Sequence, residues 1–140
     1  MTLEFKPNTY LAFELSPTSR GHLLKELPPV YEKVVCHHVT IVFRPSEAEF
    51  REVMRKMGSL SPVVEVFGRT DENGVECLSV MVNDHIKRPF NGFYHVTHSL
   101  HGNHKPVESN KILEARKGIP AERFTVGAIL LRGELKLFPL

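Results

Sequence analysis

His38-Val39-Thr40-Ile41 and His95-Val96-Thr97-His98 repeat one short pattern, His-x-Thr, and each copy lies in a run rich in β-branched and aromatic residues. Such runs predict β-strands. Alternate residues of a strand point to the same face, so the His and Thr of each copy project together. If the two strands lie side by side or face a common groove, two imidazoles and two hydroxyls converge on one point.

These four side chains suit the chemistry of a phosphodiester. The hydroxyls and protonated ring nitrogens donate hydrogen bonds to the non-bridging oxygens. One imidazole takes a proton from the attacking oxygen while the other gives a proton to the leaving oxygen. Histidine suits both roles because its ordinary pKa lies near neutrality. The pattern therefore predicts catalytic roles for His38, Thr40, His95 and Thr97.

Two other interpretations of the histidines stay open at this point. In the first, each His is a strand residue that bonds a backbone partner, and each Thr is present for its β-propensity. In the second, a metal is held by histidines that recur every three residues, namely His95, His98, His101 and His104. A strand followed by a Gly-containing turn does not bring that spacing onto one face, and no paired Cys or carboxylate joins it. We therefore expect no metal.

Strands and helices are interspersed along the chain. The segments expected as strands are 10–15, 33–43, 63–69, 76–82, 91–100, 124–131 and 134–138. The segments expected as helices are 17–26, 46–58 and 106–117. The layout predicts one α+β domain over residues 1–140, with two lobes of antiparallel sheet, each built around one central strand. Helices flank the sheets, and a groove runs between the lobes.

The segment 46–58 has the clearest helical pattern. Ser46 and Glu49 form a capping box, and Gly58 ends the helix. One apolar stripe is formed by Phe50, Val53, Met54 and Met57. In the segment that follows, Asn73-Gly74 supplies the turn chemistry of a β-hairpin.

The composition is that of an ordinary soluble globular protein. Of 140 residues, 41% are hydrophobic and 24% are charged, and the net charge is +2 with neutral histidines. That charge is too small for tight non-specific binding to long duplexes, although it allows a local basic groove for a short anionic ligand. Cys36 and Cys77 lie in apolar runs and are expected as free thiols. Without a signal-peptide pattern or a membrane-length apolar run, the expected location is cytoplasmic, in the host cytoplasm if the source is viral.

At the two His-x-Thr copies the chain resembles the two-histidine (2H) phosphoesterase superfamily, which includes LigT-like RNA phosphodiesterases. The resemblance covers most of the chain in layout, and its specific content is the eight residues of the two copies. It implies a two-lobed 2H phosphoesterase-like fold and catalysis without a metal or another cofactor. By analogy, His95 activates water or a 2′-hydroxyl, His38 protonates the leaving oxygen, and Thr40 and Thr97 hold the phosphate. His98 stands where the family usually has an apolar residue.

The function implied by these residues and by the resemblance is metal-independent cleavage of RNA-type phosphodiesters. One substrate class is the 2′,3′-cyclic phosphate end left by RNA cleavage. The other comprises small 2′,5′- or 3′,5′-linked oligonucleotide messengers, linear or cyclic. The small size slightly favours a messenger-degrading enzyme, for example a phage anti-defence protein, and the short spacing of the histidines resembles that of small viral members. The alternative is a non-catalytic protein that binds or sequesters a nucleotide or RNA. The expected partner is thus a small nucleotide or an RNA end, with no membrane.

Three further residues are expected to bind the substrate. Tyr10 lies on the first strand and either stacks on a base or packs as an edge aromatic. His101 and Lys105, in the turn after the second motif, form a rim with hydrogen-bond donors for a second phosphate or a base. His37 points away from His38 if its strand is regular, and is interpreted as structural.

Overall fold

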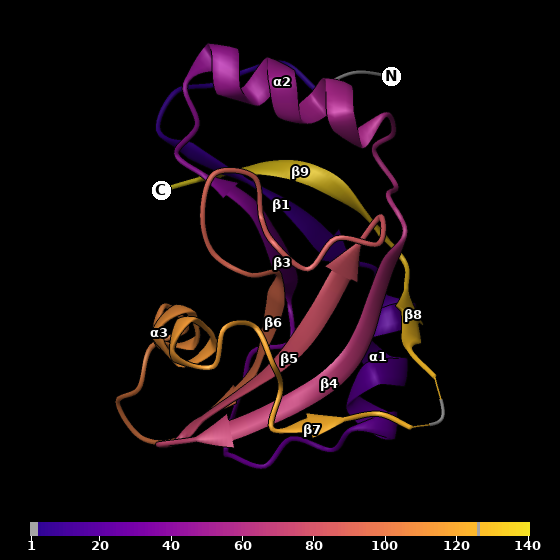
Figure 1. Cartoon of the computed structure of the whole chain (residues 1–140), viewed down its shortest axis with the longest axis vertical. Coiled ribbons are helices and arrows are strands. Elements are labelled where there is room, and N and C mark those ends of the chain that lie inside the picture. The colour runs from indigo at the N-terminus through magenta and orange to yellow at the C-terminus, as the bar shows by residue number, and fades with distance from the viewer. Residues whose placement is uncertain (1–2, 126) are drawn as a thin grey trace.

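A computed structural model describes residues 3–125 and 127–140. Its strands are β1 (Thr9–Leu15), β2 (Lys33–Val34), β3 (His38–Phe43), β4 (Val64–Glu72), β5 (Val75–Val82), β6 (His95–Leu100), β7 (Glu122–Arg123), β8 (Ile129–Leu131) and β9 (Gly133–Pro139). Its helices are α1 (Pro17–Glu26), α2 (Glu47–Met57) and α3 (Glu108–Ala115). The strands form two antiparallel sheets (Figure 1). One has the order β3-β1-β9, and the other has the order β2-β6-β5-β4-β7 with β8 also paired to β4.

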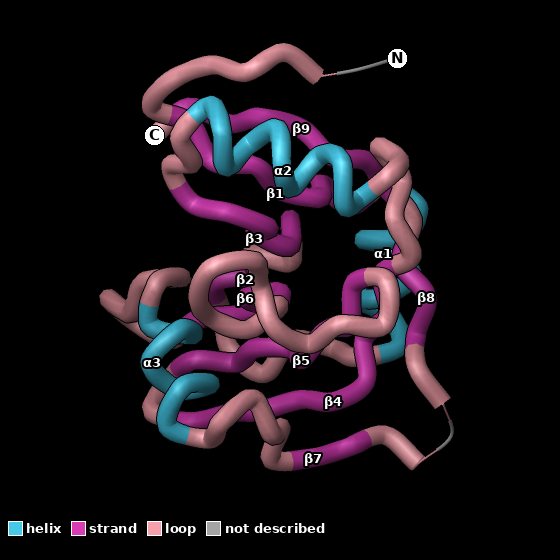
Figure 2. Tube along the Cα trace, turned by 45° about the horizontal axis from the view of Figure 1, so that its top comes forward, coloured by secondary structure: helices cyan, strands magenta, loops and turns pink. Residues whose placement is uncertain are grey.

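The two sheets share one buried core. In both views α2 lies along β9 and β1, whereas α3 lies beside the six-stranded sheet (Figures 1 and 2). Phe50 of α2 and Leu23 of α1 belong to the same buried cluster as Phe13 of β1, Val80 of β5 and Val96 of β6. Because close-packed interiors resist relative movement, this cluster holds the two sheets in a defined mutual position.

Local signals place several elements as expected. The capping box of Ser46 and Glu49 is present at the start of α2, and Gly58 ends that helix with φ 70°. Asn73 and Gly74 both have positive φ, 51° and 80°, which is the conformation of a tight hairpin turn between β4 and β5. Within the described residues, none of the helices combines the length and the apolar character that crossing a bilayer requires.

The segment 33–43, expected as one strand, forms two strands in different sheets. β2 pairs with β6, whereas β3 pairs with β1. Between them Cys36 has φ 42°, a left-handed conformation that interrupts a strand. The single-strand prediction was wrong because β-propensity does not report where a chain passes from one sheet to another. Cys36 and Cys77 are both buried and free, as expected.

Three other boundaries differ from expectation. β6 begins at His95, not at residue 91, because the chain first makes a turn in which Arg88 N–H donates to the Gly92 carbonyl (2.9 Å) and Gly92 has φ 85°. Residue 126 of the expected strand 124–131 lies outside the described residues, and the described part of that segment contributes β8. Helix α3 is shorter than 106–117. The motif strands also differ in position, since β6 lies inside its sheet while β3 lies at an edge. The central strand of the three-stranded sheet is β1, so the first motif lies on the strand beside the centre of its lobe.

Candidate functional site

A pocket of about 530 Å³ lies between the two sheets. Its lining comes from four parts of the chain. These are β1, the segment from the end of β2 through β3, the β5–β6 loop together with β6, and the start of α3. The lining residues are Tyr10, Val35, His38, Thr40, Phe43, Arg88, Asn91, His95, Thr97, Pro106, Val107 and Asn110. The pocket thus brings together both His-x-Thr motifs and Tyr10. Its volume lies within the range typical of small-ligand sites.

Strand alternation explains how the first motif reaches the pocket. His38 and Thr40 are half-buried and line the pocket, whereas Val39 and Ile41 between them are fully buried in the core. The ring of His38 packs against Tyr10 and Phe138, with centroid distances of 5.6 Å and 6.2 Å. These aromatic contacts restrict the orientation of the His38 ring.

The second motif is buried more deeply because β6 has neighbours on both sides. His95 is 9% exposed and Thr97 is 7% exposed. His95 Nδ1 lies 3.0 Å from the Phe93 carbonyl oxygen, so in the neutral ring Nδ1–H donates to that oxygen. This leaves Nε2 as the unprotonated nitrogen, which is the state that a general base requires.

Both catalytic candidates are biased toward the neutral state. Burial lowers the pKa of His38 to about 4, and the charges of His37 and His95 act in the same direction. Burial also lowers the pKa of His95 to about 4, with a further decrease from the charge of Arg88 and an opposing effect of the bond to Phe93. A bound anion would offset part of this bias, because a nearby negative charge favours imidazolium.

The two threonines differ in their surroundings. Thr97 Oγ1 donates to the Pro106 carbonyl oxygen (3.3 Å) and lies 2.9 Å from Ser109 Oγ. Its single hydroxyl hydrogen is thus directed at the segment that begins α3. Thr40 lines the pocket from β3. Of the two hydroxyls, that of Thr40 is the better placed to donate to a ligand, while that of Thr97 anchors α3 against β6.

Arg88 lines the pocket and was missed from the sequence. It is half-buried, and its Nε donates to the Asn91 carbonyl oxygen (3.0 Å). A Cβ added at Gly92 would lie 2.5 Å from Arg88 Nη2, so the glycine leaves space for the guanidinium. Across the described residues, the arginines that form ion pairs are Arg51, Arg69 and Arg116, not Arg88. A half-buried cation without a carboxylate partner suits an anionic ligand.

The remaining lining is largely apolar. Phe43 and Val107 are 62% and 66% exposed, and both lie at the pocket. Tyr10 stacks with Phe43 at a centroid distance of 6.4 Å and with Phe138 at 5.4 Å. An aromatic and aliphatic wall beside a cationic group is typical of sites that bind a base next to a phosphate.

His101 and Lys105 lie outside the pocket lining. The ring of His101 contacts Glu32 (3.3 Å from Nδ1 to Oε1) and packs against Tyr31. Lys105 is exposed, and its backbone N–H donates to Glu108. The structure therefore does not bring these two side chains to the His-x-Thr motifs.

The four regularly spaced histidines point to different places. His98 faces away from the pocket, is fully buried, and contacts the Leu27 carbonyl oxygen through Nε2 (2.6 Å) at the end of α1. His104 contacts Glu108 (2.9 Å) beside α3. In the described part of the chain, no three His, Cys, Asp or Glu side chains are grouped as metal ligands.

No protein-family model and no curated protein matches this chain. Among solved structures, the chain is similar to one described as the crystal structure of a fungal RNA kinase, with a TM-score of 0.65 and 15% identity. The match covers 100% of this chain and 47% of that chain. This chain therefore spans about half the length of the similar structure. At this identity the likeness shows a shared fold, consistent with the α+β architecture of antiparallel sheets and helices.

Acid should destabilise the fold through His95. Its pKa is about 4 in the folded protein and 6.5 ordinarily, so between these values the unfolded chain binds a proton that the folded chain does not. The free energy of unfolding should therefore fall as the pH drops through this window, with His95 contributing on the order of 2–3 kcal/mol between pH 7 and 4.5. Urea unfolding at both pH values measures this. His95→Asn, which keeps a donor for the Phe93 carbonyl, should lose less stability than the wild type. Equal losses would contradict the burial of a neutral His95.

Proposed function

We propose that this chain is a metal-independent phosphodiesterase that cleaves RNA-type phosphodiesters with His38 and His95 as an acid–base pair. The observation that carries the proposal is that both histidines line one pocket together with Thr40 and the unpaired cation Arg88. An acid, a base, a neutral donor and a guanidinium are the groups that such a reaction uses when no metal takes part.

The surroundings of the two histidines support assigning His95 as the base and His38 as the acid. The charge of Arg88 disfavours protonation of His95, whereas the charge of Glu14 favours protonation of His38. In the proposed step, His95 Nε2 takes a proton from water while the water oxygen forms a bond to phosphorus. The bond from phosphorus to the leaving oxygen breaks, its electron pair stays on that oxygen, and His38 Nε2 supplies the proton. Afterwards His95 releases its proton to solvent and His38 takes up a proton from solvent, which restores the starting state.

The phosphate is held, in this proposal, mainly by Arg88 and Thr40. A guanidinium presents several donors in a plane and matches two phosphate oxygens at once. Thr97 contributes by fixing α3 against β6, since its hydroxyl hydrogen already points at Pro106. Tyr10 borders the same space and is placed to contact a base. His101 and Lys105 contact only nucleotides that extend beyond the cleaved phosphate.

RNA is the proposed substrate class. The similar solved structure is described as an RNA kinase, and the pocket combines an apolar wall with a phosphate-compatible cation. Two kinds of substrate fit this description, namely 2′,3′-cyclic phosphate ends and small 2′,5′- or 3′,5′-linked oligonucleotide messengers. Degradation of such messengers in the cytoplasm, as a phage anti-defence enzyme acting within one 2H phosphoesterase-like domain, is the physiological setting that we propose for the second kind.

The pH dependence should differ between the free and the substrate-bound enzyme. Productive turnover needs one neutral and one protonated histidine, and in the free enzyme each pKa is about 4. Above about pH 5, kcat/KM should therefore fall as the pH rises, because the protonated acid becomes scarce. The bound phosphate raises both pKa values, so the descending limb of kcat should lie at higher pH. The two apparent pKa values belong to the coupled pair. The scheme would be contradicted if the descending limbs of kcat and kcat/KM fell at the same pH, or if the limb of kcat fell at lower pH than that of kcat/KM.

A substrate panel tests the function itself. It contains 2′,3′-cyclic mononucleotides, 2′,5′-oligoadenylate, and cyclic dinucleotides and trinucleotides, each incubated with EDTA and analysed by mass spectrometry. We expect at least one member to be converted by far less than one equivalent of protein. A protein that binds a member tightly but leaves it intact would instead be the nucleotide-sequestering alternative.

A further inference from the structure

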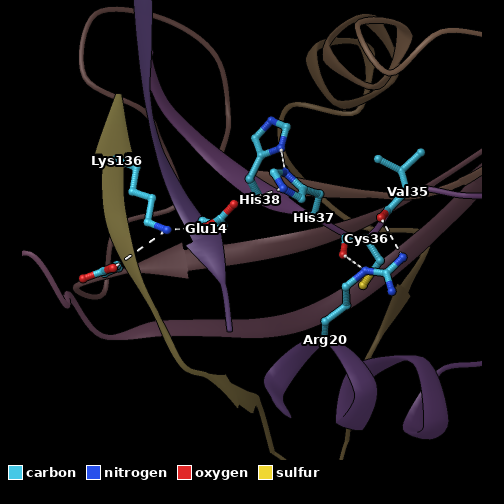
Figure 3. A network of polar contacts seen from close by, with 8 residues as sticks. Glu14, Arg20, Val35, Cys36, His37, His38 and Lys136 are labelled. Atoms are coloured by element: carbon cyan, nitrogen blue, oxygen red, sulfur yellow. Dashed lines mark hydrogen bonds and ion pairs between the residues drawn. The ribbon is translucent and has the colours of Figure 1, made fainter. Parts of the chain in front are cut away.

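Three side chains form a continuous line of polar contact that ends at His38. Glu14 Oε2 of β1 lies 3.2 Å from His37 Nε2, and His37 Nδ1 lies 2.9 Å from His38 Nδ1 (Figure 3). Glu14 and His37 are absent from the pocket lining, whereas His38 belongs to it. The line therefore runs from the surface of the three-stranded sheet to the candidate acid.

This contact is not expected of neighbouring residues in a strand. Adjacent residues of a regular strand point to opposite faces, yet the His37 and His38 rings lie 5.1 Å apart between centroids. The contact forms because β3 begins only at His38, and Cys36, two residues before His38, has φ 42°. Arg20 of α1 holds that kink, with Nε donating to the Cys36 carbonyl (2.9 Å) and Nη2 to the Val35 carbonyl (3.3 Å) (Figure 3). A positively charged side chain from another element thus fixes the backbone that delivers His37 to His38.

The contacts define where the protons lie. Glu14 is an acceptor only, because the bond from Lys136 holds the pKa of its carboxyl below the usual value. His37 must then donate to it from Nε2, which leaves Nδ1 of a neutral His37 as an acceptor. His38 therefore donates from Nδ1 to His37, and its Nε2 remains for the pocket. When His38 Nε2 is also protonated, the positive charge of the ring lies at one end of the line of hydrogen bonds, and the carboxylate of Glu14 lies at the other end.

The charged and titratable groups around His38 come from several elements. β1 contributes Glu14 and Tyr10, and β9 contributes Lys136, whose Nζ lies 2.6 Å from Glu14 Oε1 and 3.9 Å from Glu134 Oε1. From the opposite sheet come His95 and the loop residue Arg88, both at the pocket. Glu14 is thus a carboxylate that is connected to His38 through the side chain of His37. The positive charge of Lys136 opposes the effect of the Glu14 charge on His38.

We propose that Glu14 and His37 are positioning residues that fix the tautomer of His38 and stabilise its imidazolium, so that His38 Nε2 acts as the acid of the proposed phosphodiesterase. This inference rests on the proposed function for its kinetic consequences. In the proposed arrangement no proton moves along the line, Glu14 keeps its charge, and His37 takes part as the neutral ring. A protonated His37 would repel the imidazolium of His38, so the arrangement works where His37 is neutral.

Substitutions at His37 separate orientation from charge. His37→Ala removes both contacts and should lower kcat roughly 10–100-fold, the usual cost of losing a partner that orients a functional histidine, with little change in KM. His37→Asn keeps an oxygen at the place of Nδ1 but does not reach Glu14. It should recover much of kcat. The descending limb of its kcat–pH profile should still lie below that of the wild type, because Glu14 is no longer connected to His38. His22→Ala, an exposed histidine of α1 outside the pocket lining, is the matched control and should leave the kinetics unchanged.

Substitutions around Glu14 should move the pH profile in opposite directions. Glu14→Gln removes the charge that favours imidazolium, so the descending limb of kcat should shift down by roughly 0.5–1 pH unit. Lys136→Met removes the opposing charge and should shift the same limb up. Glu47→Gln, which removes a carboxylate ion-paired to Arg51 on α2, should shift nothing. A Glu14→Gln limb that stays in place, or both variants shifting it in the same direction, would overturn the charge role.

Nitrogen-15 NMR of the histidine rings tests the same arrangement without any substrate. The signals of His38 are assigned from their loss in His38→Ala. We expect neutral His38 to carry its proton on Nδ1 in the wild type and in His37→Asn, but not in His37→Ala, and its pKa to fall in Glu14→Gln. A wild-type His38 with its proton on Nε2 would overturn the inference even if the protein cleaves RNA. Conversely, the Nδ1 tautomer and the Glu14 effect would uphold the arrangement even if no phosphodiester in the panel is cleaved.

Discussion

His38→Ala and His95→Ala should each lower kcat by roughly two to four orders of magnitude, the usual contribution of general acid–base catalysis. Each substitution removes the only group proposed to donate or accept the transferred proton at its end of the reaction. Steady-state kinetics on the best substrate of the panel measure the effect. Because the two residues act as a unit, the double variant should be little slower than either single variant.

The accompanying controls separate catalysis from folding and from metal chemistry. His38→Ala should keep the cooperative unfolding of the wild type, since His38 is half-buried at the edge of its sheet. Thr40→Ala should have a smaller effect, equivalent to one hydrogen bond to a charged group, on the order of 1.5–3 kcal/mol. EDTA should leave the wild-type rate unchanged. Loss of activity on chelation that zinc or manganese restores would refute the acid–base account.

Arg88→Ala should lower kcat/KM by roughly two orders of magnitude, because it removes the cation at the place where the phosphate and its developing charge would lie. Arg88→Lys should recover only part of the loss, since an ammonium does not reproduce the planar two-point contact. Arg51→Ala, an exposed arginine of α2, is the matched control. Steady-state kinetics at several salt concentrations measure all three variants.

An Arg88→Ala variant with wild-type kcat/KM would mean that the guanidinium does not contact the phosphate. Gly92→Ala provides an independent check of the same contact. Its Cβ would meet the guanidinium, and its φ of 85° disfavours alanine, so the variant should displace Arg88 and reduce kcat/KM in the same direction.

Elements determined by local chemistry were predictable from the sequence. The capping box of Ser46 and Glu49 and the stripe through Phe50 and Val53 define α2 without reference to the rest of the chain. The Asn73-Gly74 turn likewise defines its hairpin. In each case the residues that decide the structure are neighbours in sequence, so one pattern contains all the necessary information.

Features set by distant contacts were not predictable. The break at Cys36 depends on Arg20, which is 16 positions earlier in the chain. Arg88 enters the pocket because Gly92 makes room for it in a turn that precedes β6. His37 meets His38 only because of the break, so an interpretation based on a regular strand assigned it to the wrong face. The His-x-Thr spacing, by contrast, predicted that the His and Thr of each motif project together, because strand alternation is a local property, and all four line the pocket.

Hydrolysis in oxygen-18 water tests the central claim most directly. The substrate panel is incubated in EDTA with a small fraction of an equivalent of wild-type protein, of His38→Ala or of His95→Ala, and the products are weighed by mass spectrometry. The account predicts many turnovers by the wild type, one heavy oxygen on phosphorus for each phosphodiester bond that is cleaved, and almost no product from either variant. Intact substrate throughout the panel, or equal product from the wild type and both histidine variants, would contradict it.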